Sequence, residues 1–397
     1  MKIVKTKDGV SYLWPFILVT SLFFLWGFAH SILDVLNKHF QEVLVISKAK
    51  SALVQAVVYG GYFLMALPAG AFIKRYGYRK GVILGLLLYA IGAFLFIPGS
   101  KLMSFNFFLV SLFIIGCGLT CLETAANPYI TVLGEPEYGA GRLNLAQSFN
   151  GLGWIVGPLV GGVVLFSADG DISLPYVGIG CLVILVALFF MRIRLPEVKE
   201  EAPAEEGVTK KSLWKYPHFT WGVLALFCYV AAQTGINSFF INYVTEANLG
   251  FSNGDAALLL SFGGMGLFMV GRFTGSWLMN HIPAERLLIW FSVGASLCML
   301  LVIAGWGWTS ITALFVCYLF ESIMFPTIFA LAIRKLGGHT KKASSILIMS
   351  IVGGAVAPVL MGLLGEQNMS IGFIVPLICF FVICAYSAMY KRTVAAK

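Results

Sequence analysis

The stretch SLFFLWGFAHSILDVLNKHF, residues 21–40, carries the features that decide the fold. It continues an apolar run that begins near Leu13, and a run of this length can cross a hydrocarbon core of about 30 Å as a helix. The run is much longer than the roughly 15 apolar residues of a signal peptide. One acid, Asp34, lies inside it. The stretch therefore predicts a retained membrane span that contains a carboxyl group.

The remainder of the 397-residue chain repeats this apolar pattern. Apolar and aromatic residues make up 59% of the chain and charged residues only 11%, against roughly 25% charged in soluble domains. The apolar runs predict spans at about 13–40, 51–73, 81–98, 105–133, 143–166, 174–192, 219–246, 256–279, 287–306, 310–334, 343–364 and 369–390. We therefore expect an all-α integral membrane protein with twelve transmembrane helices.

The basic residues predict the orientation of these spans. If the N-terminus is cytoplasmic, 22 Lys and Arg residues fall in inner segments, and only Lys38, Lys48, Lys50 and Lys101 fall in outer ones. This asymmetry satisfies the positive-inside rule, so both termini are expected in the cytoplasm. The net charge of +9 thus reflects topology and does not indicate nucleic acid as a partner.

A polar stretch at residues 193–218 divides the chain into an N-terminal six-helix bundle, 1–192, and a C-terminal one, 219–397. The stretch is rich in Glu and Lys and cannot build a core, so we expect a cytoplasmic linker. A weak internal repeat supports two related halves. Glu123 precedes Pro128 by five residues, as Glu321 precedes Pro326. Two parallel six-helix repeats are typical of the major facilitator fold.

Three acids lie in the predicted hydrocarbon zone: Asp34, Glu123 and Glu321. Each is costly there and is expected to face the bundle interior or a watery cavity. A lone carboxylate in a low dielectric resists ionisation, so it can load and release a proton as water access changes. The structural alternative is an ion pair with a buried base, and Lys38, one turn after Asp34, is a candidate.

Amides gather on the predicted interior helices: Gln147 and Asn150 on span five, and Gln233, Asn237 and Asn242 on span seven. Amides both donate and accept hydrogen bonds, which suits sugar hydroxyls, although single buried amides more often join helices. Trp26 could provide a face for a sugar ring, as could other aromatic side chains. His30, one turn before Asp34, could relay protons or be a satisfied core histidine.

The sequence does not indicate a cofactor, a metal site or an enzyme. All eight cysteines lie inside apolar runs, where they are expected to pack as small core residues. We find no nucleotide-binding loop, zinc signature or nucleophile elbow.

Several of these stretches resemble the fucose, galactose and glucose cation symporter family of the major facilitator superfamily. They are residues 21–40, CLETAANPYITVLG at 121–134, RLNLAQSFNGLG at 142–153, FCYVAAQTGINSFFINY at 227–243, GRFTGSWL at 271–278 and SIMFPTIFALAIRKLG at 322–337. The resemblance implies that Asp34 couples transport to a cation and that Glu123, Gln147 and Asn150 line the sugar cavity. It also implies a bacterial inner membrane as the location.

The sequence departs from the family pattern near the presumed cavity. His30 and Ser31 stand where the pattern has asparagines, Asn237 replaces a tryptophan, and Glu321 stands where an apolar residue is expected. The substrate therefore need not be fucose. Glu321 is either a further cavity group for substrate or cation, or an acid paired with a base.

We therefore expect a monomeric importer of a monosaccharide that uses proton symport and alternating access. A sodium-coupled symporter and a sugar efflux transporter are the alternatives within the superfamily. A sugar sensor would keep the amides without needing titrating acids, and a membrane enzyme would require a reactive constellation that the sequence lacks.

Overall fold

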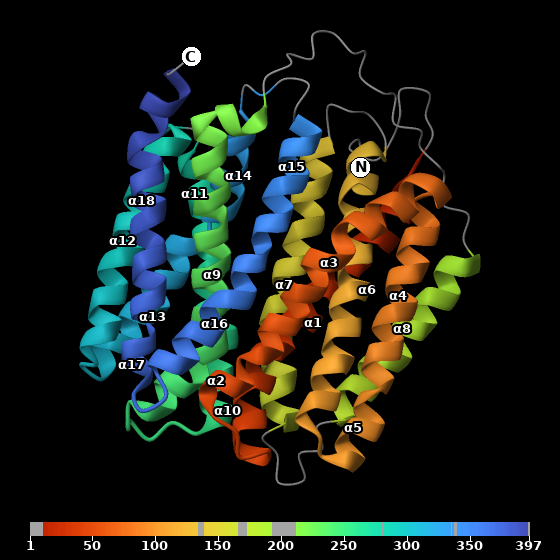
Figure 1. Ribbon diagram of the computed structural model, residues 1–397, viewed down its shortest axis with the longest axis horizontal. Helices are drawn as coiled ribbons and strands as arrows, with labels where there is room; N and C mark the ends of the chain where they lie inside the picture. The colour runs from red at the N-terminus through yellow and green to blue at the C-terminus, as the bar shows by residue number, and fades with distance from the viewer. Residues whose placement is uncertain are drawn as a thin grey trace. The chain divides into compact units, whose positions relative to one another are not determined.

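The computed structural model describes residues 11–133, 139–165, 173–192, 212–279, 281–334, 336 and 340–395. Helices dominate this part of the chain (Figure 1). Eleven of its helical stretches are long and apolar enough to cross a membrane. The predicted span 143–166 corresponds to a further helix, α7 (Gly139–Leu165). Each of the twelve predicted spans is thus occupied by helix, as a chain in lipid requires, because only internal hydrogen bonds satisfy its backbone.

The helices separate into two compact units. One unit contains residues 1–39 and 57–202, and the other contains residues 40–56 and 203–397. The boundary at 202 and 203 falls inside the polar linker, which itself lies mostly outside the described residues. Residues 40–56 group with the C-terminal unit, although they connect two helices of the N-terminal one.

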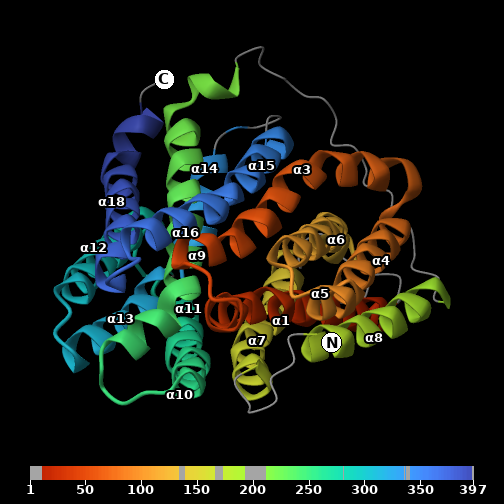
Figure 2. The same cartoon turned by 60° about the horizontal axis from the view of Figure 1, so that its bottom comes forward.

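The N-terminal unit is built on close helix contacts. Its helices are α1 (Leu13–Val43), α3 (Leu53–Tyr76), α4 (Tyr78–Phe94), α5 (Phe96–Leu102), α6 (Phe105–Val132), α7 and α8 (Ser173–Arg192). Helix α4 packs between α6 and α8 (Figures 1 and 2). A Cβ added at Gly116 of α6 would lie 2.6 Å from the Val58 carbonyl oxygen of α3. Glycine there lets the two backbones touch.

The C-terminal unit is centred on α9 (Pro217–Glu246), which runs beside α16 and α18 (Figure 1). Its remaining elements are α2 (Lys48–Ser51), η3 (Leu213–Lys215), α10 (Asn253–Leu258), η4 (Leu259–Gly264), α11 (Met265–Leu278), α12 (Ala284–Ala304), α13 (Trp308–Glu321), α14 (Met324–Ile333), α15 (Thr340–Met349), η6 (Ser350–Val352), α16 (Gly353–Leu364), α17 (Met369–Gly372) and α18 (Ile374–Ala395).

Several helical stretches of the C-terminal unit are interrupted, among them the predicted spans ten and eleven. Span ten is divided into α13 and α14 by a turn at Ser322 and Ile323. Pro326 contributes to this break, because it has no N–H to donate to the Ser322 carbonyl and its ring crowds that carbonyl. Span eleven is divided into α15 and α16 by the short helix η6. By contrast, α6 runs unbroken past residue 128.

Residues 40–56, which we call the 40–56 segment, are fixed to the C-terminal unit by polar contacts. The Lys48 ammonium lies 2.7 Å from Glu246 Oε1 and also donates to the Gly365 carbonyl at 2.7 Å. Glu366 accepts hydrogen bonds from the backbone N–H groups of Lys48 and Ala49 at the start of α2. A Cβ added at Gly362 of α16 would lie 2.7 Å from Ala49 Cα, so the backbones of α2 and α16 are in direct contact.

Candidate functional site

The predicted acid of span one lies deep inside the N-terminal unit. Asp34 is 2% exposed and sits on α1, one helical turn after His30, which is 6% exposed. Spacing of four residues places both side chains on the same face of the helix. The face therefore offers a carboxyl group and an imidazole together, away from lipid.

Glycines on α7 bring this helix against α1. A Cβ at Gly153 would collide with the backbone of α1 at Phe24 and Phe28, and a Cβ at Gly157 would collide with Ser31 Oγ. Ser31 also donates a hydrogen bond of 3.2 Å to the Gly153 carbonyl. Small residues and an interhelical hydrogen bond therefore fix α1 and α7 at the depth of His30 and Asp34.

Four aromatic rings surround His30. The ring centroids of Trp26, Tyr59, Tyr62 and Trp154 lie 6.3, 5.8, 5.5 and 6.1 Å from the imidazole centroid, respectively. They come from α1, α3 and α7, so three helices contribute to one enclosure. Aromatic faces of this kind stack on the apolar side of a sugar ring, while the imidazole and hydroxyls can exchange hydrogen bonds with its polar edge.

Glu123 belongs to the same neighbourhood. It lies half-buried on α6, and the Tyr62 hydroxyl faces both its carboxyl group and the Trp26 indole. Among the described residues, the Tyr62 hydroxyl has no hydrogen-bond partner of standard geometry. The structure thus brings Trp26, His30 and Glu123 together around Tyr62 in the N-terminal unit.

The two amides predicted on α7 differ in their surroundings. Asn150 is buried and donates a hydrogen bond of 3.1 Å to the Phe23 carbonyl of α1. Its amide nitrogen therefore joins two helices. Gln147, one turn earlier, is half-buried. Of the pair, Gln147 is the amide more open to a ligand.

The amides on α9 are in part engaged within the C-terminal unit. Asn237 accepts a hydrogen bond of 2.8 Å from the Tyr318 hydroxyl, and its Nδ2 has no partner among the described residues. Asn242 exchanges hydrogen bonds with Gln41 of the 40–56 segment, at 2.7 and 3.4 Å. Gln233 is half-buried. Gln233 is thus the most open of the three amides to a ligand, Asn237 is 1% exposed, and Asn242 holds the segment.

Glu321, the third predicted acid, is fully buried at the end of α13, and both of its carboxyl oxygens lack a hydrogen-bond partner among the described residues. This setting differs from that of Glu123, which is half-buried on an unbroken helix. In this conformation Glu321 is not open to a ligand dissolved in water.

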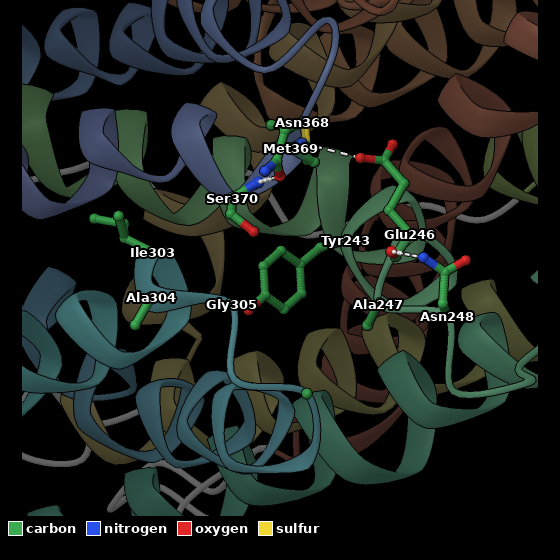
Figure 3. Close-up of a pocket in the computed structure, with 11 residues that line it drawn as sticks. Tyr243, Glu246, Ala247, Asn248, Ile303, Ala304, Gly305, Asn368, Met369 and Ser370 are labelled. Carbon is green, nitrogen blue, oxygen red and sulfur yellow. Dashed lines mark hydrogen bonds between the residues drawn. The ribbon is translucent and has the colours of Figure 1, made fainter.

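A cavity of about 310 Å³ lies at the ends of α9 and α12 within the C-terminal unit (Figure 3). Tyr243, Glu246, Asn368 and Ser370 contribute polar groups to its wall. Glu246 Oε2 accepts a hydrogen bond of 2.9 Å from the Met369 backbone N–H, while Oε1 is paired with Lys48. This cavity does not include the intramembrane acids. Its wall instead contributes to the attachment of the 40–56 segment.

Tyr59 and Tyr62 were not predicted from the sequence as members of the aromatic enclosure. Both lie on α3 within the run VVYGGYFLMAL, where they are two aromatic residues among many. Their spacing of three residues could have shown that they share a helix face. Only packing shows that the face meets His30.

Comparisons with known proteins agree with this architecture. The sequence pattern of the Major Facilitator Superfamily matches residues 16–358. The chain belongs to this superfamily. It is 38% identical to the L-fucose-proton symporter of Escherichia coli strain K12, over 96% of this chain and 94% of that protein. It is 36% identical to the glucose/galactose transporter of Brucella abortus, over 98% and 97% of the two chains.

Solved structures of superfamily members show the same fold. The E. coli fucose:proton symporter FucP in the outward conformation matches with a TM-score of 0.70 at 37% identity, over 96% of this chain and 99% of that one. The D-xylose-proton symporter matches with a TM-score of 0.78 at 14% identity, which is a likeness of fold alone. The expected major facilitator fold is confirmed.

Proposed function

We propose that this protein is a secondary active transporter that imports a monosaccharide by proton symport. The observation that carries the proposal is the grouping of two intramembrane acids, Asp34 and Glu123, with the aromatic enclosure around His30. Carboxyl groups inside a membrane protein bind protons or polar ligands, since they are otherwise too costly. The chain's similarity to a fucose-proton symporter and to a glucose/galactose transporter supports the same chemistry.

The proposed roles follow from burial. Asp34, the more deeply buried acid, carries the coupling proton, and Glu123, which is half-buried beside Tyr62, contributes to coupling and accepts hydrogen bonds from sugar hydroxyls. Trp26 and His30 contact the sugar ring and its edge. Gln147 and Asn150 from α7, and Gln233 and Asn237 from α9, provide further amide contacts to the sugar during alternating access.

The proposed setting is a bacterial inner membrane, crossed by a monomer with both termini in the cytoplasm. The excess of basic residues in the predicted inner segments supports this orientation. A single cysteine placed at Glu205, in the linker outside the described residues, is expected to react only with reagent on the cytoplasmic side. Labelling from the outer side of intact cells would reverse the proposed orientation.

Uptake into proteoliposomes tests the function directly. A panel of labelled L-fucose, D-galactose, D-glucose and D-xylose is offered with an inward proton gradient, an inward sodium gradient, or neither. We expect accumulation of at least one sugar with the proton gradient alone, abolished by a protonophore. Accumulation that requires sodium would assign sodium as the coupling ion. No accumulation of any sugar would refute the proposal.

A further inference from the structure

Glu321 occupies the most isolated position of any acid in the described part of the chain. It is 0% exposed, and neither carboxyl oxygen has a hydrogen-bond partner there. Burying a carboxyl group without a hydrogen bond costs free energy, and burying it ionised costs far more. A glutamine or methionine would fill similar space at lower cost. The position thus holds a titratable group that local packing does not require.

The elements packed against α13 offer Glu321 no basic partner. They are α11, α12, α14 and η4, and α9 contacts α13 through Asn237 and Phe240. Helix α9 contains no Lys or Arg, and its one histidine, His218, lies in its first turn. Neither α14 nor η4 contains a titratable residue. The only one on α11 is Arg272, whose guanidinium lies 4.9 Å from the Phe268 ring centroid. The titratable group that acts on Arg272 is the Tyr229 hydroxyl, and Glu321 is not its partner.

The titratable groups near Glu321 are two thiols and the Tyr318 hydroxyl, which donates to Asn237 Oδ1. Cys317 lies one turn earlier on α13, and Cys298 faces it from α12. The other titratable residues of α12, Glu285 and Arg286, lie in its first turn, far along the helix from Cys298. Thiols do not neutralise a carboxylate, so an ion pair with a base, the structural alternative for this acid, is not formed among the described residues.

The helix break lies directly beside this acid. Helix α13 ends at Glu321, and α14 begins only at Met324. Since Pro326 cannot donate to the Ser322 carbonyl, the junction lacks a helical hydrogen bond that would hold it rigid. Ser322 and Thr327 side chains instead bond to carbonyls on either side, Ser322 Oγ to Leu319 and Thr327 Oγ1 to Ile323, both at 2.7 Å. A junction of this kind can change angle without unfolding either helix.

We propose that Glu321 is a second proton-carrying residue of the transporter, which holds its proton in this conformation and releases it when the junction between α13 and α14 opens to water. Release breaks the carboxyl O–H bond and transfers the proton to a water molecule, leaving a hydrated carboxylate. Return to the present conformation requires that a proton be taken up again. The inference deepens the proposed function, on which it rests, and it implies about two protons per sugar.

The proton-to-sugar ratio tests the proposal. Proteoliposomes that contain the wild-type protein are loaded with the labelled sugar that the protein accumulates. The proton gradient at which the net sugar flux is zero is then measured. With two protons, a gradient of about one pH unit balances about 100-fold sugar accumulation; with one proton it balances about tenfold. We expect the larger value for wild type and the smaller one for Glu321→Gln, which keeps the shape of the side chain but cannot titrate.

Control variants separate titration from packing. Glu321→Asp retains a carboxyl group and is expected to retain about two protons per sugar. Cys317→Ser changes the neighbouring thiol and is expected to leave the ratio unchanged. A ratio of about one proton per sugar in the wild type would overturn the proposal, even if Glu321→Gln failed to fold. An unchanged ratio in a folded Glu321→Gln variant would also overturn it.

Two further outcomes keep this proposal distinct from the proposed function. A changed ranking of sugars with an unchanged ratio would make Glu321 a specificity residue and would overturn its role as a proton carrier. Wild-type sugar flux without any proton flux would overturn proton symport itself.

Discussion

Removing the ion pair between Lys48 and Glu246 is expected to loosen the 40–56 segment from the C-terminal unit. The side chains are 12% and 34% exposed, and their charged atoms lie 2.7 Å apart. Buried charge-assisted hydrogen bonds contribute roughly 1.5 to 3 kcal/mol, and exposed ion pairs about 0.2 to 1 kcal/mol. A partly buried pair falls between these values, at about 1 to 2 kcal/mol. The open population of the segment should then rise about five- to thirty-fold.

A buried side chain in the segment reports this opening. Ser51 is 0% exposed, so a cysteine at that position reacts with a maleimide only when the segment separates from its neighbours. Ser51→Cys is made in a background without the eight native cysteines, and its labelling rate is measured in membrane vesicles. We expect Lys48→Met and Glu246→Gln each to raise the rate about five- to thirty-fold, and the double variant to match the larger single effect.

A nearby lysine provides the matched control. Lys50→Met removes the same charge from the same short helix but leaves the Lys48–Glu246 pair intact, so its labelling rate should rise less than that of Lys48→Met. Unchanged labelling in the single variants would show that the pair does not hold the segment. If the effects of the two single variants add in the double variant, Lys48 and Glu246 act independently. That result would contradict direct pairing of the two side chains.

The remaining predictions concern the N-terminal unit. Asp34→Asn should abolish gradient-driven accumulation but retain sugar exchange, which needs no net proton release; full accumulation would remove Asp34 from coupling. Glu123→Gln should weaken sugar binding about ten- to a hundred-fold, because a charge-assisted hydrogen bond of roughly 1.5 to 3 kcal/mol is lost. An unchanged affinity in calorimetry would assign a structural role to Glu123. Gly153→Ala should lower the thermal unfolding midpoint, since its Cβ collides with the α1 backbone and overpacking costs roughly 1 to 3 kcal/mol. Gly178→Ala is the control, because a Cβ added there meets nothing within 4 Å.

The local sequence predicted the position of Asp34 well and that of Glu321 less well. Both acids were expected inside spans, and both lie inside helical stretches. The spacing between Glu123 and Pro128 recurs between Glu321 and Pro326, which suggested that the two acids have equivalent surroundings. The structure shows an unbroken α6 in one case and a break between α13 and α14 in the other. Proline alone does not decide this, since Pro68, Pro158 and Pro358 also lie inside continuous helices.

The sequence by itself determined the spans and the few acids within them. These features follow from a one-dimensional requirement, because each span must satisfy its own backbone in lipid and exclude most charges. Only the tertiary structure decided which side chains meet. The rings around His30 come from three helices, and Gln41 bonds to Asn242 across 201 residues of sequence. Such contacts depend on how helix faces pack against one another, and the hydropathy of a single span does not contain that information.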